Sequence, residues 1–289
     1  QLELLRTLGR LRLQIEAARG GVSLSVPEQE VVATDSRWDL AFRAPLPVED
    51  WNAQLSLATG MGAAALMLEG GVGILRTLPP ARDGAIAKLR RTASALGIAW
   101  AQSTSYPDFV RSLDASVPAQ AAMLNACTTL FRGAGYQSFR GTIPEQPLHA
   151  AIAAPYAHTT APLRRLVDRY TGEICVAVCA GTEVPEWAAS GMADLPGVMD
   201  DADRRAKKYE RGVVDLVEAM VLAPHLGRTF TGTVLEVDPE DDLGVLQLPQ
   251  PAVEAKVKGA ELVLGEQVSA TLVAADLLAG KVEFRILAD

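Results

Sequence analysis

The fold is decided by the stretch APYAHTTAPLRRLVDRY, which occupies residues 154–170. It is a polar, hydroxyl-rich loop that leads into an apolar segment, and it predicts a helix beginning at Pro162, because proline is favoured in the first helical turn. Thr160 is placed to cap this helix. The free amides of the helix N-terminus, together with Arg164 and Arg165, predict an anion site suited to phosphate. The alternative is an ordinary helix cap with solvated or salt-bridged arginines.

Helices are predicted on both sides of this stretch. Residues 2–18 have leucine and isoleucine at helical spacing, and residues 48–69 begin with acidic side chains that suit the positive end of a helix dipole. A long amphipathic helix is predicted over residues 199–222, whereas the prolines and glycines of residues 182–198 predict a loop. Two short strands are expected after the first helix, and residues 38–43 alternate as on a half-buried strand. Further helices are expected at residues 83–96, 118–132 and 162–180.

The pattern of the sequence changes after Pro224. From Gly227 onward, short alternating segments are separated by turns, and five such strands predict a small barrel of the OB type. Phe230 and Phe284 are expected in its core. The predicted domains are therefore residues 1–224 and residues 227–289. The strands are expected at residues 229–237, 245–248, 252–257, 267–273 and 281–287.

Composition and charge restrict the function. The chain has 289 residues, of which 49% are hydrophobic and 21% charged, as in a globular protein with a sizeable core. Its net charge of −8 excludes a uniformly basic nucleic-acid coat but not a local basic groove. Residues 227–289 have five basic and eleven acidic side chains, so this segment is expected to bind RNA poorly. No apolar run reaches the ~18 residues that a membrane span needs. Cys175 and Cys179 are expected on the buried side of a helix, which predicts reduced thiols and a cytoplasmic location.

Residues 156–165 resemble a family signature. The run Tyr156-Ala157-His158-Thr159-Thr160-Ala161-Pro162-Leu163-Arg164-Arg165 is similar to the Tyr-Ala-His-Phe-Thr-Ser-Pro-Ile-Arg-Arg signature of the ribonuclease II catalytic domain, the RNB domain. Residues 43–78 resemble the helical stretch that precedes the signature in actinobacterial and deinococcal-type members, and the segment after residue 227 resembles the RNA-binding OB-fold that ends these enzymes. The resemblance covers nearly the whole chain, as the C-terminal part of a longer protein. The departures from the signature are Thr159, Ala161 and Leu163.

The resemblance implies an activity and a set of site residues. The family degrades single-stranded RNA from its 3′ end and releases nucleoside 5′-monophosphates with magnesium. Arg164 matches the arginine that contacts the scissile phosphate in the family, and Glu210 falls at the position of a glutamate thought to assist departure of the product nucleotide. Four other residues of the signature are expected to contact RNA, namely Tyr156, His158, Thr160 and Arg165.

The metal-binding aspartates of the family are missing from this chain. The family holds magnesium with four aspartates in an Asp-x5-Asp-x-Asp-Asp pattern upstream of the signature, and residues 1–150 contain no such pattern. Two Mg²⁺ ions on clustered carboxylates would activate water and stabilise the leaving oxygen, so the ligands are expected upstream of this chain. A similar group of acids follows the signature and is interpreted as a capping and solvated segment: Asp194, Asp200, Asp201 and Asp203.

A basic strip is predicted on the helix over residues 199–222, beside an apolar stripe. Its cations would neutralise RNA phosphates, or they form a solvated face that balances nearby aspartates. His158 would hydrogen-bond RNA or order its own loop, and Asp168 is expected to orient Arg164 through an i,i+4 pair. The strip consists of Arg204, Arg205, Lys207, Lys208 and Arg211, of which all but Arg205 are candidate RNA contacts. The stripe consists of Tyr209, Val213, Leu216, Val217 and Met220.

These observations predict an α+β protein, in which the helix-rich C-terminal portion of an RNB catalytic domain precedes a five-stranded OB-type barrel. The expected function is that of a metal-dependent 3′-to-5′ exoribonuclease of the ribonuclease II type, although this chain alone is expected to be inactive. The alternative is a non-catalytic RNA-binding or regulatory protein on the same fold. A third hypothesis is that the chain is a protein–protein adaptor, and this hypothesis predicts that the chain has no affinity for RNA at low salt.

Overall fold

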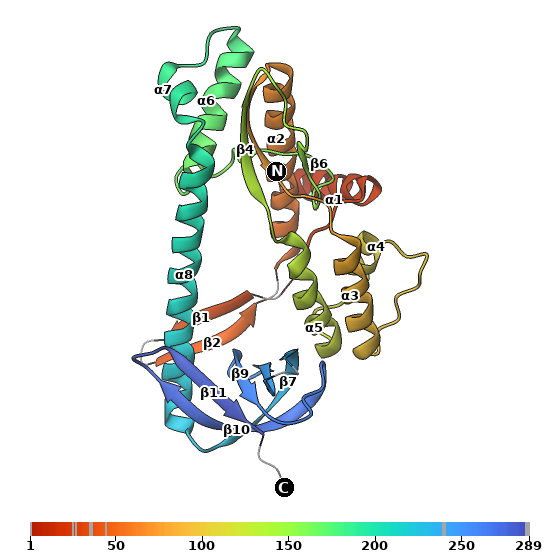
Figure 1. Ribbon diagram of the computed structural model, residues 1–289, viewed down its shortest axis with the longest axis vertical. Helices are drawn as coiled ribbons and strands as arrows, with labels where there is room; N and C mark the ends of the chain where they lie inside the picture. Colours follow the sequence, from red (N-terminus) through yellow and green to blue (C-terminus); the bar gives the residue numbers. More distant parts are fainter. Residues whose placement is uncertain are drawn as a thin grey trace. The chain divides into compact units, whose positions relative to one another are not determined.

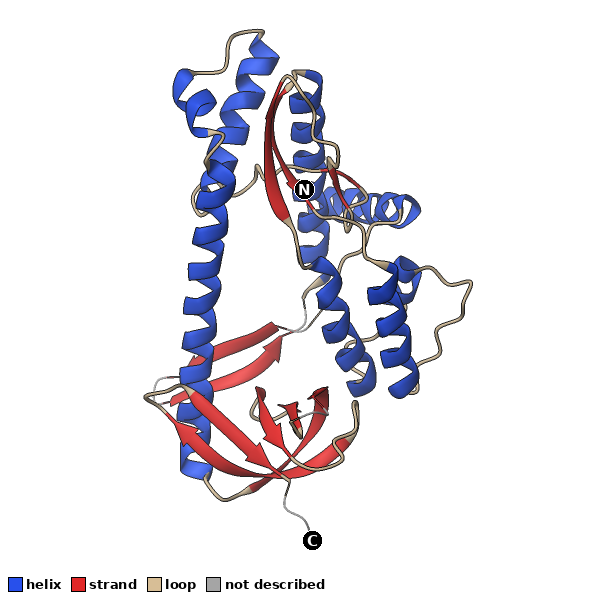
Figure 2. Ribbon diagram, viewed as in Figure 1, coloured by secondary structure: helices blue, strands red, loops and turns tan. Residues whose placement is uncertain are grey.

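The computed structural model describes residues 2–24, 26, 28–34, 37–43, 45–238 and 241–286 (Figure 1). Helices and strands alternate irregularly before a run of strands at the C-terminal end (Figure 2). The helices are α1 (Leu2–Arg19), α2 (Pro47–Glu69), α3 (Asp83–Ala95), α4 (Tyr106–Arg111), α5 (Pro118–Cys127), α6 (Leu166–Ala180), α7 (Glu186–Gly191) and α8 (Leu195–Leu222), with short 3-10 turns η1 (Thr128–Phe131) and η2 (Ala223–His225). The strands are β1 (Glu28–Thr34), β2 (Arg37–Arg43), β3 (Val72–Thr77), β4 (Gly135–Arg140), β5 (Leu148–His149), β6 (Ala154–Pro155), β7 (Thr229–Asp238), β8 (Leu243–Leu248), β9 (Val253–Lys258), β10 (Gln267–Asp276) and β11 (Lys281–Arg285).

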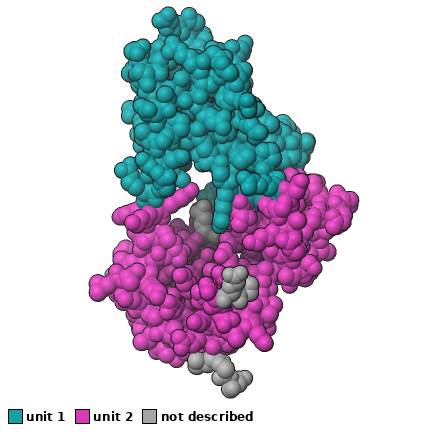
Figure 3. Space-filling view, viewed as in Figure 1, with its two compact units in different colours: residues 1–23, 45–82, 130–205 teal, residues 24–44, 83–129, 206–289 magenta. Residues whose placement is uncertain are grey.

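The chain folds into two compact units, each assembled from separate segments (Figure 3). We call the first the signature unit, because it contains residues 154–170; it comprises residues 1–23, 45–82 and 130–205. The second, the barrel unit, comprises residues 24–44, 83–129 and 206–289. Helix α8 contributes its first turns to the signature unit and the remainder to the barrel unit.

The barrel unit is built around a closed five-stranded barrel with the strand order β7–β8–β9–β11–β10. The β9–β11 pair is parallel and the other pairs are antiparallel, which is the connectivity of an OB-fold. The register shifts within β7 and within β10, and such bulges bend the strands enough to close the barrel. Phe284 is buried in the barrel core, and Phe230 packs against that core. The predicted α+β fold with an OB-type barrel is confirmed.

Other segments of the barrel unit complete its core. Leu40 on β2 is buried together with the barrel residues, and the backbone amide of Ala252 donates to the carbonyl oxygen of Leu40 at 3.2 Å. The last turns of α8 add Val217 and Leu222 to the same core. Only Val217 of the predicted apolar stripe is buried, because the helix turns Glu218, Ala219 and Leu222 inward instead. The rest of the stripe stays at least one-third exposed: Tyr209, Val213, Leu216 and Met220.

The signature unit is organised around an antiparallel ribbon of β3 and β4, in which Arg76 pairs with Tyr136. Helices α2 and α6 pack on this ribbon through Met67, Ile74 and Ile174, which are all fully buried. Helix α6 ends at Gly181, whose φ of 66° is the left-handed conformation that favours glycine at a helix C-terminus.

Helix α1 packs on α2 through its polar side. A Cβ added to Gly9 would lie 2.3 Å from the Cβ of Trp51, so only glycine permits this approach. The buried carboxylate of Glu16 accepts hydrogen bonds from Ser23 at 2.8 Å and from Gln54. The predicted helix is confirmed, but its leucines and isoleucine at helical spacing are exposed: Leu4, Leu8, Leu11 and Ile15.

Two predictions about the region after the signature are wrong. Residues 182–198 are not a continuous loop, because α7 forms within them and α8 already begins at Leu195. The expected burial of both cysteines on α6 also fails: Cys175 is half-buried and Cys179 is exposed. Ala177 lies on the buried face of α6. Cys179, two positions later, points away from this face because each residue turns a helix by ~100°.

Candidate nucleic-acid interface

The residues of the signature form a tight turn before α6 rather than the first turn of the helix. The amides of Arg164 and Arg165 both donate to the carbonyl oxygen of Ala161, at 3.2 and 3.0 Å, and the helix begins only at Leu166. The predicted helix start at Pro162 is therefore wrong, and so is the predicted cap by Thr160, which is exposed and lies before the turn.

Asp168 holds both ends of this turn. Its carboxylate accepts a hydrogen bond from the backbone amide of Ala161 at 2.7 Å, and a bidentate pair from Arg165 at 2.8 and 2.9 Å. The side chain of Asp168 is fully buried, so the ion pair is shielded from water. The expected pair between Asp168 and Arg164 does not form, because the turn directs Arg165 toward the carboxylate.

The turn projects Arg164 into solvent. Arg164 is exposed and has no ion pair within the described residues, and the adjacent Leu163 is completely exposed. The two arginines thus differ in role: the charge of Arg165 is matched by Asp168, whereas the guanidinium of Arg164 is free to meet an anion. A planar guanidinium in this position suits phosphate oxygens.

Helix α2 and strand β3 fix the start of the signature. The amide of Ala157 donates to the carbonyl oxygen of Gly60 at 3.1 Å, and the amide of Arg76 donates to the carbonyl oxygen of Tyr156 at 2.8 Å. A Cβ added to Gly60 would lie 2.2 Å from Cε2 of Tyr156. The absence of a side chain at Gly60 therefore lets the signature approach α2 closely.

An aromatic and imidazole cluster lies beneath the turn. The Tyr136 hydroxyl is hydrogen-bonded to Nδ1 of His158 at 2.7 Å, and the ring of Tyr156 meets His158 edge-on with centroids 5.5 Å apart. Burial, followed by the charges of Arg165 and Arg76, lowers the pKa of His158 to about 3. Burial and Arg76 lower the pKa of His149 to about 4. Both imidazoles are therefore neutral at physiological pH.

The low pKa of His158 predicts acid sensitivity. The unfolded chain takes up a proton near pH 6.5, whereas the folded chain does not until about pH 3, so stability is present above pH 6.5 and is lost as the pH falls. Between pH 7 and pH 5 we expect the wild type to lose about 2 kcal/mol more unfolding free energy than His158→Gln. Urea unfolding at both pH values measures this. His225→Gln, outside the cluster, serves as the control and should behave as wild type. Equal acid losses for His158→Gln and wild type would contradict the assignment.

The other predicted contact residues lie along α8. Lys208 and Glu210 are exposed, and Glu210 belongs to the barrel unit whereas Arg164 belongs to the signature unit. Arg204 is paired with Asp201. Arg211 is paired with Asp215 at 2.6 Å. Lys207 is exposed on the same helix. The basic strip is thus partly neutralised by acids of its own helix, as the solvated-face alternative requires.

The aspartates near the start of α8 do not form a metal site. Within the described residues, no group of three or more His, Cys, Asp or Glu side chains is arranged to hold a metal ion. Asp201 is engaged by Arg204, and Asp200 is exposed on the helix. Hard divalent cations need several oxygen ligands converging on one point, so the residues present do not fit magnesium.

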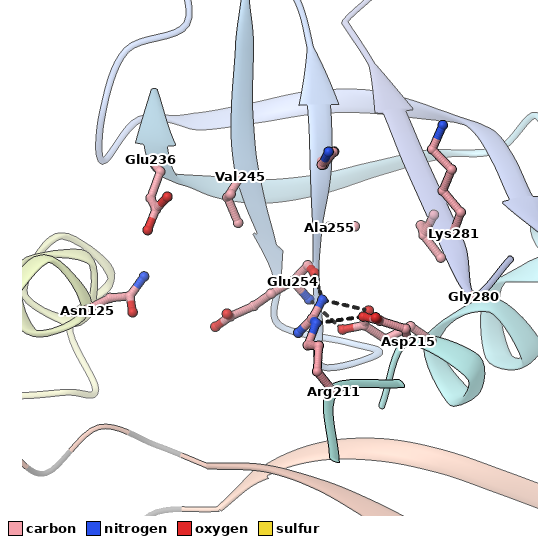
Figure 4. Close-up of a pocket in the computed structure, with 12 residues that line it drawn as sticks. Asn125, Arg211, Asp215, Glu236, Val245, Glu254, Ala255, Gly280 and Lys281 are labelled. Carbon is pink, nitrogen blue, oxygen red and sulfur yellow. Dashed lines mark hydrogen bonds and ion pairs between the residues drawn. The ribbon is translucent and has the colours of Figure 1, made fainter. Parts of the chain in front are cut away.

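A cavity of about 470 Å³ lies in the barrel unit, between α8 and the outer face of the barrel (Figure 4). Arg211 points into it and also donates to the carbonyl oxygen of Glu254 at 3.4 Å. The carboxylate of Glu218 accepts hydrogen bonds from Gln29 at 2.8 Å and from the amide of Glu254 at 3.2 Å, and burial raises its pKa. Acidic residues outnumber basic ones in the lining, which disfavours phosphate. The charged lining residues are Arg211, Asp215, Glu218, Glu236, Glu254, Lys256 and Lys281.

Comparison with known proteins gives a family match for the C-terminal segment and a shared fold for nearly the whole chain. Residues 228–287 match the family described as the RNase II-type exonuclease C-terminal S1 domain. RNase R from Mycoplasma genitalium, in its apo form, has the same fold, with a TM-score of 0.81 over 99% of this chain at 16% identity. The resemblance to the ribonuclease II family is confirmed. No curated protein matches the sequence significantly.

Two further solved structures share the fold of this chain. Dss1, an exoribonuclease from Candida glabrata, matches 99% of this chain with a TM-score of 0.73 and 14% identity. Ssd1 from yeast, described as a pseudonuclease, matches 92% with a TM-score of 0.60 and 18% identity. The chain spans 49% of RNase R, 35% of Dss1 and 34% of Ssd1. Among the residues described above, no helix is long and apolar enough to cross a membrane.

Sequence reasoning missed two residues that contact the signature. Arg76 and Tyr136 are 60 positions apart and meet only through the register of β3 and β4. Neither strand was expected, since residues 72–77 follow directly after a helix and residues 135–140 lack apolar alternation. The only signal in the sequence was the Tyr-Ala-His run of the signature, which contains His158. This run does not indicate that Tyr136 is the hydrogen-bond partner of His158.

Proposed function

We propose that this chain binds the 3′-terminal part of single-stranded RNA through the turn that carries Arg164, as the C-terminal portion of a ribonuclease II-type 3′-to-5′ exoribonuclease. The observation that supports this most directly is the division between the two arginines. Asp168 neutralises Arg165 and pins the turn, whereas Arg164 on the same turn is exposed and forms no ion pair within the part of the chain that the structure describes. A guanidinium held by a rigid turn is preorganised for a phosphate whose charge grows during reaction.

The comparisons support RNA as the ligand. Mycoplasma genitalium RNase R has been solved in complex with ribose-methylated single-stranded RNA and with double-stranded RNA. Both complexes match 99% of this chain. We infer that the shared fold presents the same surface to RNA here.

Hydrolysis needs more than this chain supplies. The described acids do not converge on a metal site, so we propose that magnesium is held by carboxylates outside these 289 residues. In that arrangement Arg164 contacts the scissile phosphate, and Glu210 assists release of the nucleotide. The alternative, a non-catalytic RNA-binding protein, is supported by the match to Ssd1, a pseudonuclease on the same fold.

RNA binding without cleavage is the expected behaviour of the purified chain. We expect a fluorescent oligouridine to bind at low salt, and Arg164→Ala to make the plot of log affinity against log salt shallower by about 0.7, the value for one phosphate contact to a single strand. Fluorescence anisotropy at several salt concentrations measures both. Arg132→Ala, which removes an exposed arginine of the same unit, is the matched control and should leave the slope unchanged.

The same samples test hydrolysis. With magnesium present, the RNA is expected to remain intact on a denaturing gel. Release of monophosphates that is lost in Asp200→Asn/Asp201→Asn would show that the α8 aspartates form a working site. An absence of binding at low salt would contradict the proposal and favour the adaptor reading.

A further inference from the structure

Arg76 on β3 is a half-buried cation without a counter-charge. Within the described residues it forms no ion pair with a carboxylate. Arginines that leave the solvent are normally paired, because transferring a charge from water is costly unless an opposite charge or hydrogen bonds compensate. Arg165, in the same unit, follows this rule through Asp168. Arg76 does not follow it, and its backbone lies against the signature.

The position of Arg76 is fixed on two sides. Its backbone amide holds the carbonyl oxygen of Tyr156 at 2.8 Å, and its guanidinium lies over the ring of Tyr136, 4.5 Å from the centroid. The Tyr136 hydroxyl in turn holds His158. A guanidinium stacked on a ring keeps the N–H donors at its edge available, so the stacking orients Arg76 without using up its hydrogen bonds.

The surroundings leave the positive charge uncompensated. The neighbouring imidazoles of His149 and His158 are neutral, and Arg76 is among the charges that lower the pKa of each. The carboxylate that lies closest to the signature turn is that of Asp168, and it is already engaged by Arg165. The cluster as a whole therefore favours an anion.

A buried hydroxyl group within the signature also lacks a hydrogen-bond partner in the described part of the chain. The hydroxyl of Thr159 follows His158 directly, is buried, and has no hydrogen-bond partner within the described residues. Buried hydroxyls are almost always hydrogen-bonded, so an unsatisfied one indicates a missing partner. Hydroxyl donors and guanidinium groups are both used by proteins to hold a phosphate.

We propose that Arg76 is a second phosphate-binding arginine, which takes the backbone phosphate of an RNA nucleotide next to the one held by Arg164. The assignment rests on the proposed function, since it names a further contact of the same RNA site. Arg76 reads no base; it fixes the position of the strand so that Arg164 meets the correct phosphate.

The test is the salt dependence of binding to a single-stranded oligouridine, with the whole chain. Arg76→Ala is expected to weaken binding about tenfold and to reduce the slope of log affinity against log salt by about 0.7. Arg76→Lys keeps the charge but loses the forked donor, so its slope should match wild type while its affinity falls. The matched control is Arg140→Ala, which removes an exposed arginine at the other end of the same ribbon and should change neither quantity.

The outcomes separate this inference from the proposed function. If Arg164→Ala reduces the slope and Arg76→Ala does not, RNA binding stands and the assignment of Arg76 is overturned. If the wild type does not bind, the proposed function fails first. Circular dichroism checks the fold of each variant. If Arg76→Ala does not fold, the Arg76→Lys variant provides the test. An RNA affinity of Arg76→Lys equal to wild type would overturn the assignment. A reduced affinity with an unchanged salt slope would support it.

Discussion

Replacing Asp168 with alanine is expected to lower the free energy of unfolding by about 3–5 kcal/mol, the cost of removing one partner of a buried ion pair. The carboxylate is fully buried and satisfies both the Ala161 amide and the Arg165 guanidinium. Without it, a largely buried charge and a backbone donor lose their partner together. Urea unfolding at pH 7 measures the loss.

The control for this variant is Asp200→Ala. Asp200 is exposed on α8, so its replacement should change the unfolding free energy by less than about 0.5 kcal/mol. Asp168→Asn keeps the shape and one acceptor oxygen, and should fall between wild type and Asp168→Ala. A loss below about 1 kcal/mol for Asp168→Ala would show that the turn does not depend on the ion pair.

Gly60→Val is expected to be the second most damaging change, with a loss of about 3 kcal/mol. The new Cβ alone would lie 2.2 Å from the Tyr156 ring and 2.5 Å from the carbonyl oxygen of Ala157, which is backbone and cannot move aside cheaply. The signature would have to shift away from α2, so RNA affinity should fall with stability. Urea unfolding and anisotropy measure the two effects.

A neighbouring glycine provides the matched control. Gly62 lies on the same helix, and nothing is within 4 Å of the Cβ that Gly62→Ala would add. Since alanine is the better helix former, this variant should be stabilised by up to about 1 kcal/mol. Similar losses for Gly60→Val and Gly62→Ala would mean that the contact with Tyr156 is not the cause.

Local patterns predicted most of the helices and the barrel. The helix over α2 follows from its acidic first turn and its terminal glycines, and the barrel strands follow from alternation interrupted by turns. Both signals depend on neighbours within a few residues, which is why they can be read from one sequence.

The sequence could not predict which face of a helix would be buried, or which arginine would be paired. The leucines of α1 mark a helix correctly, yet the structure buries Gly9 and Glu16, because α2 offers a close approach and a polar partner in Gln54. Asp168 lies three positions from Arg165 and four from Arg164, and both spacings are compatible with an ion pair. Arg165 is the arginine that pairs, because the backbone turn at Ala161 directs its side chain toward the carboxylate of Asp168.

Photo-crosslinking of RNA to the chain tests the central claim most directly. A single-stranded RNA with 4-thiouridine at its 3′ end is bound to the purified protein, irradiated and digested, and the crosslinked peptides are identified by mass spectrometry. We expect crosslinks within residues 154–170, where Arg164 is presented, and their loss in Arg164→Ala. Crosslinks confined to residues 227–289 would show that the barrel, not the signature, holds the RNA and would contradict the account.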